Sequence, residues 1–289
     1  MTRNRLPDLL NALGHLRALP ERPGIVVVDN ASSDATVATV RHPDVEVISL
    51  NENLGAAGRN IGVQATETPY VAFSDDDSWW APGSLSRAAD LFDANPRLGL
   101  MVARILVGPR EREDPICKEM AHSPLPEEPD LPGPPVLGFL ACAAIVRRSA
   151  YLEVGGFEPR VLIGGEEDLL AADLASAGWG LAYVHDVVAH HHPSTIRDAR
   201  AVRRLGVRNA LWFAWLRRPV SPATRQTLRV LGAVPRNPDA RAGLVKAVQG
   251  LPWALRKRRV VPPHVESRLR TLDLERGLRA LSKPGSRTS

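Results

Sequence analysis

The sequence predicts an α/β fold, in which a sheet is covered by helices. Short apolar strands alternate with helices along the first part of the chain, and acidic side chains stand directly after two of these strands. In such sheets the ligand site lies at the carboxyl ends of the strands, so both sets of acids are expected in one site. With 289 residues and 44% apolar composition, the chain can bury a substantial core.

Hydrophobic periodicity defines the elements of the first hundred residues. Leucines at helical intervals predict a helix over residues 6–19, and the continuous apolar run 24–28 is typical of a strand buried on both faces. The same reasoning predicts the elements that follow, which are a helix over 35–41, a strand over 45–50, a helix over 56–65, a strand over 70–73, a helix over 85–93 and a strand over 98–106.

The rest of the chain is less regular. Residues 107–135 are rich in proline and charge and have little periodicity, which predicts an irregular loop that is either a mobile cover or disordered. From residue 195 onward the pattern is helical, so we predict an α/β domain over 1–195 and a basic helical region over 196–289. Between these parts we expect a strand over 136–146, a helix near 149–154, a helix over 166–177 and short apolar segments ending at the histidines 190–192.

Composition narrows the class of protein. The net charge is +5, and the segment 197–218 and the tail from Arg256 carry much of the basic excess. Two cysteines make neither a disulfide framework nor a thiolate metal site. Since no apolar run approaches the ~20 residues that span a bilayer and the N-terminus lacks the pattern of a signal peptide, we expect a cytoplasmic protein.

The most informative cluster is the run Asp75, Asp76 and Asp77, directly after an apolar strand. Three adjacent carboxylates repel one another, and a hard divalent cation such as Mg²⁺ or Mn²⁺ is their natural partner because it prefers oxygen ligands. The alternative is an acidic turn or helix cap. Trp79 and Trp80, which follow, are expected to be packing residues.

The order of the motifs resembles the family 2 glycosyltransferases with a GT-A fold. The resemblance covers roughly residues 2–195 and rests on 26–34 (VVVDNASSD), 51–60 (NENLGAAGRN), 74–77 (SDDD), 155–157 (GGF), 166–168 (EED), 178–179 (GW) and the histidines near 190. It implies a GT-A-type nucleotide-binding sheet flanked by helices, with a helical C-terminal appendage. It also implies transfer of a sugar, with inversion, from a nucleoside-diphosphate donor to an acceptor hydroxyl. A UDP- or dTDP-sugar is the expected donor, and the acceptor is a glycan, a lipid-linked molecule or a small molecule, as in cell-envelope polysaccharide synthesis.

One departure concerns the N-terminus. Family members usually begin with an apolar strand directly before a Thr-Tyr-Asn-Arg-like segment; residues 2–5 (TRNR) resemble that segment, and the strand is missing. Losing a buried parallel strand would expose apolar surface and unpaired backbone groups. We therefore expect that the true start lies upstream of Met1; the alternative is a sheet without a central strand.

The resemblance assigns roles to individual residues. The nucleotide-binding candidates are Thr2, Asn4, Asp29, Arg59, Asp75 and Asp76, and the metal candidates are Asp75, Asp77 and His190. Asp29 suits a nucleobase or ribose hydroxyl, but it and Asp34 could instead cap the next helix. Arg59 could donate to the nucleotide or be a solvated arginine. His192 is an alternative to His190 as the metal ligand. The histidines could instead form a solvent-facing cluster with no metal role.

For the base that deprotonates the acceptor, Asp168 matches the family position at a helix start, and Glu167 is the close alternative. First-turn acids also complement a helix dipole without any catalytic role. Rival functions are a sugar nucleotidyltransferase and a non-catalytic protein that binds nucleotide sugars. The acidic cluster argues against nucleic acid as a partner.

The segment 197–218 interleaves arginines with leucines and tryptophans. Such an amphipathic basic helix can lie on an anionic membrane surface, which would give a peripheral location on the inner face of the membrane. It can equally pack as an ordinary helix with a charged outer face.

Overall fold

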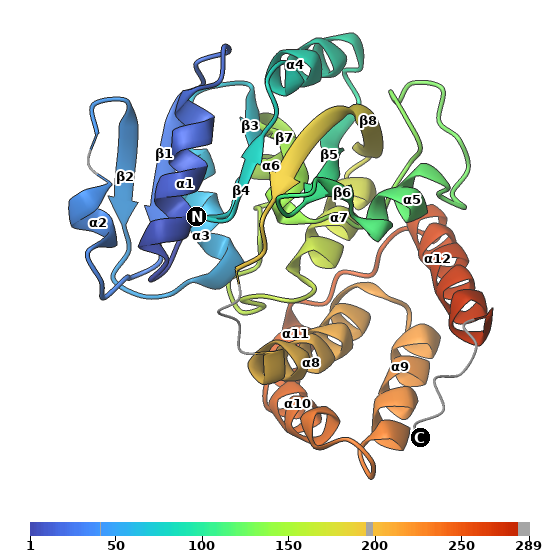
Figure 1. Cartoon of the computed structure of the whole chain (residues 1–289). Helices are drawn as coiled ribbons and strands as arrows, with labels where there is room; N and C mark the ends of the chain where they lie inside the picture. The colour runs from blue at the N-terminus through green and yellow to red at the C-terminus, as the bar shows by residue number, and fades with distance from the viewer. Residues whose placement is uncertain (41, 195–198, 283–289) are drawn as a thin grey trace.

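The computed structural model describes residues 1–40, 42–194 and 199–282 (Figure 1). Its strands form two sheets. β1 (Ile25–Asp29) and β2 (Val45–Ser49) pair in parallel, with Ile25 opposite Val45. The larger sheet has the order β3-β7-β5-β8-β4, with β6 beside β5, and its strands are β3 (Tyr70–Ala72), β4 (Ser78–Trp80), β5 (Leu98–Val107), β6 (Arg112–Glu113), β7 (Ala144–Arg147) and β8 (Gly180–His191).

Helices cover both sheets and confirm the predicted α/β class. Those of the first 180 residues are α1 (Leu6–Arg17), α2 (Thr36–Thr39), α3 (Gly58–Ala65), α4 (Ser84–Ala94), α5 (Pro115–Ala121), α6 (Arg148–Glu153) and α7 (Glu166–Ser176), with short 3₁₀ turns η1 (Gly55–Ala57) and η2 (Ala141–Ala143). Five helices follow: α8 (Ala199–Arg217), α9 (Val220–Ala233), α10 (Pro238–Gln249), α11 (Leu251–Arg256) and α12 (Pro263–Ser282). None of the described helices is long and apolar enough to cross a membrane.

The larger sheet is mixed. β5 and β8 run parallel, whereas β3, β4 and β6 pair antiparallel with their neighbours, as does β7 with β5. β5 is the centre of the core, since its residues from Leu98 to Ala103 are fully buried. A strand that is buried on both faces of a sheet has a continuous apolar sequence, and the position of β5 could therefore be predicted from the sequence.

Three sequence predictions fail locally. The strand expected over 136–146 is confined to residues 144–147, because the apolar run before it instead forms an irregular path and η2. The sequence did not predict β4, because this strand has only three residues, Ser78–Trp80, which directly follow the three aspartates and pair with β8. The segment 107–135 is not a plain loop: Asp114 accepts a hydrogen bond from the Ile116 N–H at 2.9 Å and caps α5, which buries Cys117.

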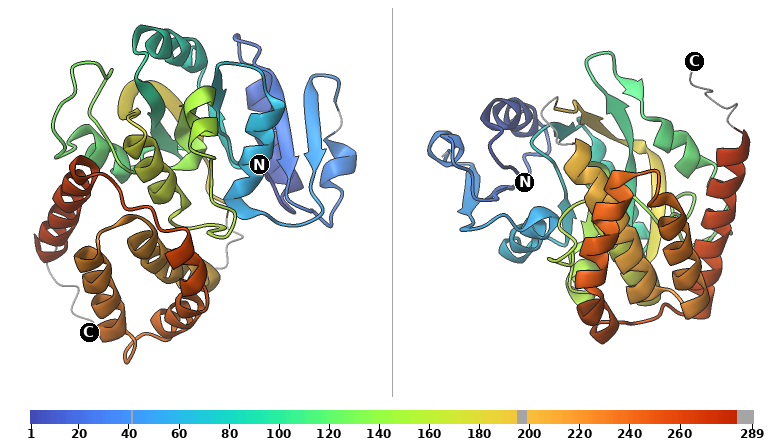
Figure 2. Two further views of the ribbon diagram at one scale, coloured as in Figure 1. Left: turned by 180° about the vertical axis from the view of Figure 1, so that it is seen from behind. Right: turned by 90° about the horizontal axis from the view of Figure 1, so that it is seen from below.

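The C-terminal helices are integrated with the α/β body. Helices α8 to α11 gather below the larger sheet, and α12 lies at the end of the molecule opposite β1 and β2 (Figures 1 and 2). Val261, Val265 and Leu269 belong to the same buried cluster as β5 and β8. The predicted boundary at 195/196 falls in a stretch outside the described residues, so the two-domain division stays a prediction.

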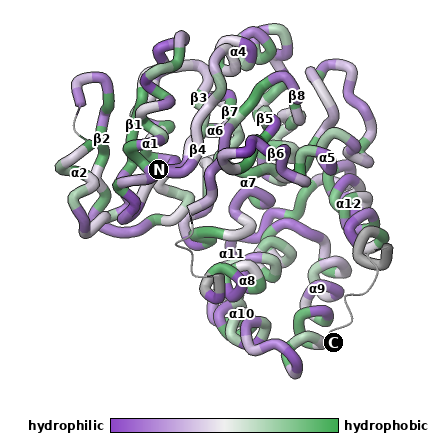
Figure 3. The backbone as a smooth tube through the Cα atoms, in the orientation of Figure 1, coloured by the Kyte–Doolittle hydropathy of each residue, from purple (hydrophilic) through white to green (hydrophobic). Residues whose placement is uncertain are grey.

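The membrane contact predicted through 197–218 stays a prediction, but the apolar face of this segment is packed inside the protein. Helix α8 carries hydrophobic and hydrophilic stretches (Figure 3), and its apolar side chains Leu211, Trp212 and Leu216 are buried inside the helical group. Trp212 packs edge-on against Trp253, with ring centroids 5.1 Å apart. The alternative interpretation, an ordinary packed helix, is the correct one for this face.

Candidate active site

Polar side chains meet where β1, β3 and β8 end. Asp29 closes β1, the three aspartates connect β3 to β4, and His190 and His191 close β8. Each aspartate has different partners. Asp75 forms an ion pair with Arg59, Asp76 accepts a hydrogen bond from the Thr2 hydroxyl at 3.0 Å, and Asp77 Oδ2 accepts one from the Ser194 N–H at 3.0 Å. The sequence could not separate the roles of the three aspartates, but in the structure each of them has a different partner.

Arg59 is buried, which excludes the solvated-arginine alternative. It is 8% exposed, and its guanidinium carbon lies 5.9 Å from the Phe73 ring centroid and 5.7 Å from that of Phe157. Burial lowers the pKa of this guanidinium, but Asp75 and then Glu167 outweigh that effect and leave the pKa raised. Its Nε makes no hydrogen bond. Arg59 is thus a fixed cation with a spare donor at the site, suited to an anionic ligand.

Asp76 holds the N-terminal segment in place. It is 8% exposed, and Arg5 Nη1 lies 4.0 Å from its Oδ1. Burial raises the pKa of Asp76 to about 6, against the opposing effects of the N-terminal ammonium, Arg5 and the Thr2 hydroxyl. In this structure the Thr2 hydroxyl and the Asp76 carboxylate are hydrogen-bonded to each other. Their predicted contacts with a nucleotide stay predictions.

Asp29 and Asn4 shape the turn after β1. The Asp29 carboxylate accepts hydrogen bonds from the backbone N–H of Ser32 at 3.0 Å and from the Ser32 hydroxyl. Asn4 Oδ1 accepts from the Ser33 N–H at 2.7 Å. Asp34 accepts from the Thr36 N–H at 3.0 Å just before α2, but the N-cap position itself is Ala35, one residue later than expected. Both predicted nucleotide contacts therefore line one ordered turn at the end of β1.

The histidine nearest the aspartates is His191. Successive residues of β8 face opposite sides of the sheet, so His190 and His191 diverge. His191 Nε2 lies 3.5 Å from Asp77 Oδ1 and is buried without a hydrogen bond. His190 Nδ1 lies 3.4 Å from Glu111 Oε1, and its ring stacks against Trp79 with centroids 5.7 Å apart. His191 is therefore the histidine beside Asp77, and the metal role predicted for His190 stays a prediction.

The donor set fits a divalent cation that shares its ligands with a substrate. An aspartate and a histidine whose buried Nε2 has no hydrogen bond are suitable ligands for Mg²⁺ or Mn²⁺. Among the described residues, no group of three or more His, Cys, Asp or Glu side chains could by itself hold a metal ion. Mg²⁺ is commonly held by one or two carboxylates together with substrate phosphates, which is the arrangement that Asp77 and His191 would allow.

A second acidic group begins helix α7. Gly164 and Gly165 precede it with φ of 86° and 102°, a left-handed conformation that favours glycine, and this turn sets Glu166, Glu167 and Asp168 in the first helical turn. Glu166 is 5% exposed, and its Oε2 makes no hydrogen bond. Acids at this end of a helix complement its dipole, yet burial of this degree exceeds what a dipole role requires.

Glu167 and Asp168 have different electrostatic neighbours. Burial and the adjacent Glu166 raise the pKa of Glu167 to about 8, against the opposing effect of Arg59. Burial also raises the pKa of Asp168, but its charged neighbours are Arg276 and Asp273 on α12. Arg59 therefore acts on both Glu166 and Glu167, whereas the charged groups that act on Asp168, the first candidate for the base, belong to the C-terminal helix.

The buried thiol of Cys142 lies behind this group. Burial raises its pKa, and Asp75, Asp77 and Glu167 add to that effect while Arg59 opposes it. One buried atom thus feels the charges of both acidic clusters. The charges of the aspartates after β3 and of Glu167 therefore both reach this buried thiol.

Several residues that build the site had no recognisable sequence signal. Asn60 Oδ1 accepts from the Tyr151 hydroxyl at 2.5 Å and from the Phe157 N–H at 2.9 Å, which fastens the glycine turn at 155–157 to α3. Asn209, far along the chain in α8, donates to three carbonyls of the loop before α7. Only the presence of Asn60 at the end of the motif 51–60 hinted at its importance.

Comparison with known proteins gives the family. Residues 1–155 match the family model described as Glycosyl transferase family 2, and the chain belongs to that family. It is 35% identical over 207 residues to the pre-mycofactocin glycosyltransferase of Mycobacterium tuberculosis, and 31% identical over 229 residues to the N-acetylglucosaminyl-diphospho-decaprenol L-rhamnosyltransferase of the same organism. The first alignment covers 67% of this chain but 43% of that relative, and the second covers 66% and 75%. The membership argues against the nucleotidyltransferase alternative.

Solved structures share the fold. The mannosyltransferase PcManGT from Pyrobaculum calidifontis, in complex with GDP-Man and Mn²⁺, aligns with a TM-score of 0.55 and 21% identity over 97% of this chain and 78% of its own. TarS from S. aureus aligns with a TM-score of 0.57 and 19% identity over 92% and 80%. The predicted GT-A architecture is confirmed.

Proposed function

We propose that this protein transfers a sugar from a nucleoside-diphosphate donor to an acceptor hydroxyl, with inversion at the anomeric carbon. The observation that carries the proposal is the buried cation Arg59 paired with Asp75, in the same acidic turn whose Asp77 lies beside His191. Family membership and the names of both relatives, each a glycosyltransferase, support it.

The donor would lie across the ends of β1 and β3. The buried Arg59, which keeps one N–H without a partner, would donate to the diphosphate, and the turn ordered by Asp29 and Asn4 would receive the nucleoside. A structure of TarS holds UDP, and that of PcManGT holds GDP-Man with Mn²⁺. We propose a UDP- or dTDP-sugar as the donor here.

A divalent cation, Mg²⁺ or Mn²⁺, would be held by Asp77 and His191, with Asp75 beside them. When bound, it would neutralise charge on the departing diphosphate. Arg59 serves the same end from the protein side, because a buried guanidinium interacts strongly with developing phosphate charge.

Glu167 is proposed as the base, in place of Asp168. Its carboxylate would accept the proton of the acceptor hydroxyl while the hydroxyl oxygen bonds to the anomeric carbon and the bond from that carbon to the diphosphate breaks. Attack from the face opposite the leaving group inverts the configuration. A carboxyl with a pKa of about 8 is a strong enough base for this step once it is ionised. The acceptor is proposed to be a glycan, lipid-linked or small-molecule hydroxyl; the relatives' names mention pre-mycofactocin and a diphospho-decaprenol.

Calorimetric titration of UDP, dTDP and GDP, each with and without Mn²⁺, tests the proposal. We expect one nucleotide to bind at least about tenfold more tightly with Mn²⁺, and this gain to be lost in Asp77→Asn and in His191→Ala. His190→Ala is the matched control and should keep the gain. If no nucleoside diphosphate binds at millimolar concentration, or if His190→Ala and His191→Ala behave alike, the proposed donor site is wrong.

A further inference from the structure

The helices that follow α8 have a strongly uneven charge. Residues 220–261 contain nine arginines and lysines but a single acid, Asp239. That acid is neutralised from α8, because the Nε atoms of Arg203 and Arg204 donate to its carboxylate at 3.0 and 2.9 Å. In the described part of the chain, none of the nine cations forms an ion pair. The segment therefore keeps an unneutralised positive charge that favours an anionic partner.

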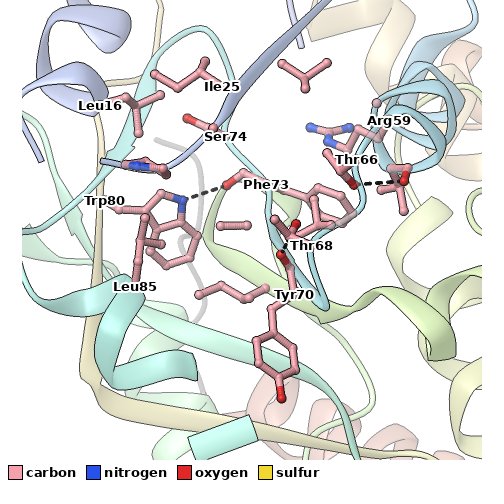
Figure 4. A pocket seen from close by; sticks show the side chains of 18 of the residues that line it. Leu16, Ile25, Arg59, Thr66, Thr68, Tyr70, Phe73, Ser74, Trp80 and Leu85 are labelled. Carbon is pink, nitrogen blue, oxygen red and sulfur yellow. Dashed lines mark hydrogen bonds between the residues drawn. The ribbon is translucent and has the colours of Figure 1, made fainter. Parts of the chain in front are cut away.

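Three of these cations line a groove on α10. The groove has a volume of about 790 Å³ and begins at the connection between α9 and α10, which is the lowest part of the molecule in Figure 1. Its lining includes Arg236, Arg241 and Lys246 but no acidic and no aromatic residue. The cavity between β1 and β3 is different, since its lining is mainly apolar and includes Leu16 and Trp80 (Figure 4). A groove with three cations and no counter-charge suits a phosphate group.

Exposed aliphatic side chains accompany these cations. On α10, Val245 lines the groove, Val248 lies one turn further along the same face, and the two are 53% and 58% exposed. On α9, Leu228 and Leu231 are also one turn apart and are 62% and 46% exposed. Single exposed apolar side chains are ordinary. Two such pairs on the helices that meet at the groove favour a partner that is apolar as well as anionic.

The preceding helix α8 has the opposite arrangement. Its apolar side chains Leu211 and Leu216 are buried inside the helical group, and its cation Arg217 is buried against Asp173. Side chains that are already packed or paired are not available to a partner. The exposed basic and aliphatic surface therefore belongs to α9 and α10, and it is separate from the contact predicted through 197–218.

The two kinds of side chain together fit a lipid headgroup. A guanidinium binds phosphate oxygens through paired hydrogen bonds, and basic side chains are attracted to an anionic membrane. Aliphatic side chains beside them can enter the boundary between headgroups and acyl chains without any helix crossing the bilayer. Single-stranded nucleic acid would instead require aromatic side chains on which its bases stack, and the lining of the groove has none.

We propose that the groove along α10 binds the phosphate of an anionic phospholipid headgroup and so docks the protein on a bilayer surface. Arg236, Arg241 and Lys246 contact the phosphate, and Val245 and Val248 enter the apolar boundary next to it. The inference goes beyond the proposed function, because it concerns a surface of α9 and α10 and requires neither donor nor acceptor.

Sedimentation with vesicles at low salt tests it. We expect the chain to sediment with vesicles made of phosphatidylcholine and phosphatidylglycerol in equal parts, and not with vesicles of phosphatidylcholine alone. The triple variant Arg236→Gln/Arg241→Gln/Lys246→Gln should bind the anionic vesicles at least about tenfold more weakly, because it removes the cations that contact the phosphate. The variant Val245→Ser/Val248→Ser should bind them at least about fivefold more weakly, although it keeps every charge.

The matched control removes the same charge from another exposed part of the chain. It is Arg110→Gln/Arg112→Gln/Lys118→Gln, in the segment 107–135, and it should bind within about threefold of the wild type. Hydrogen exchange gives an independent reading, since the backbone amides of residues 245–249 should exchange at least ~10-fold more slowly on anionic vesicles, whereas those of α5 should not change.

Equal binding by the two triple variants, or an unchanged affinity of the valine variant, would overturn the proposal. Failure of the wild-type chain to sediment with the anionic vesicles would do the same. So would release from the vesicles by millimolar glycerol phosphate but not by sodium chloride of the same ionic strength, because the groove would then be a site for soluble phosphate esters.

Discussion

At the scale of single residues, Glu167 and Asp168 show why a motif can be found in sequence while its roles cannot. Both are acids at a helix start, and the resemblance placed the base among them. The charged groups that act on Asp168 are Asp273 and Arg276 of α12, about a hundred residues further along the chain, so no local pattern could distinguish the two acids. The same limit applied to the histidines: the strand was predictable, but its register against Asp77 depends on pairing with β4.

Replacing these two acids separately distinguishes their roles. Glu167→Gln should lower kcat by about 10²–10⁴, because it removes a proton acceptor while it retains size and hydrogen bonding. Asp168→Asn should keep kcat within about threefold of the wild type. Steady-state turnover gives kcat, and calorimetry of the nucleotide should give nearly unchanged Kd values for both variants. A larger loss in Asp168→Asn than in Glu167→Gln would restore Asp168 as the base.

The raised pKa of Glu167 also predicts a pH-dependent stability. Because the folded state holds this proton up to a pKa of about 8, whereas the unfolded chain releases it near 4.5, the contribution to stability is complete below pH 4.5 and is lost as pH rises through about 8. Glu167→Gln should therefore become more stable relative to the wild type as pH increases. Urea unfolding of both proteins at pH 6 and pH 9 measures this. A difference between them that does not change with pH would contradict the shift, and Glu153→Gln, at an exposed position at the end of α6, serves as a control.

At the scale of elements, the strongly periodic ones were predictable and the ones defined by distant partners were not. β5 and α7 follow from their own apolar patterns. The run 136–143 is equally apolar yet forms no regular strand, since its Val136 N–H pairs with Leu181 outside a ladder. The turn before α7 is likewise fixed from afar, because Asn209 Nδ2 donates to the carbonyls of Val161, Ile163 and Gly164 at 3.0, 3.0 and 2.7 Å.

Asn209→Ala should release that turn. The change leaves the Ile163 and Gly164 carbonyls without this donor, whereas the Val161 carbonyl keeps Arg208, so we expect a loss of about 1–3 kcal/mol in the free energy of unfolding. It should also lower kcat, since the turn positions Glu167. Urea unfolding and steady-state turnover are the measurements. Arg229→Ala, on the exposed face of α9, is the control and should change stability by less than about 0.5 kcal/mol. Unchanged kcat with lowered stability would separate the loop from catalysis.

At the scale of the whole molecule, the arginines of 197–218 show how composition misleads about surfaces. A basic helix with tryptophans suggested a membrane contact, but its cations pair inside the protein. Arg218 is 8% exposed and forms two hydrogen bonds of 3.0 Å with Glu266 of α12. Arg217 is 6% exposed and pairs with Asp173 of α7 at 2.5 and 2.9 Å. These partners come from helices on either side of α8 in the sequence, so no local pattern could reveal them.

The Arg217 pair connects the C-terminal helices to α7, the helix that carries Glu167, and it gives a test of that connection. Arg217→Met should lower the free energy of unfolding by about 3–5 kcal/mol, because it leaves the Asp173 carboxylate buried without its cation. Asp173→Leu alone should cost a comparable amount. The double variant should recover most of the loss, since an apolar pair of similar volume replaces a buried ion pair at little net cost. Equilibrium unfolding of the four proteins measures the coupling. If the two single losses simply add in the double variant, the pair does not join the helices energetically, and the C-terminal region is held to the α/β body by its other contacts, such as the Asn209 hydrogen bonds.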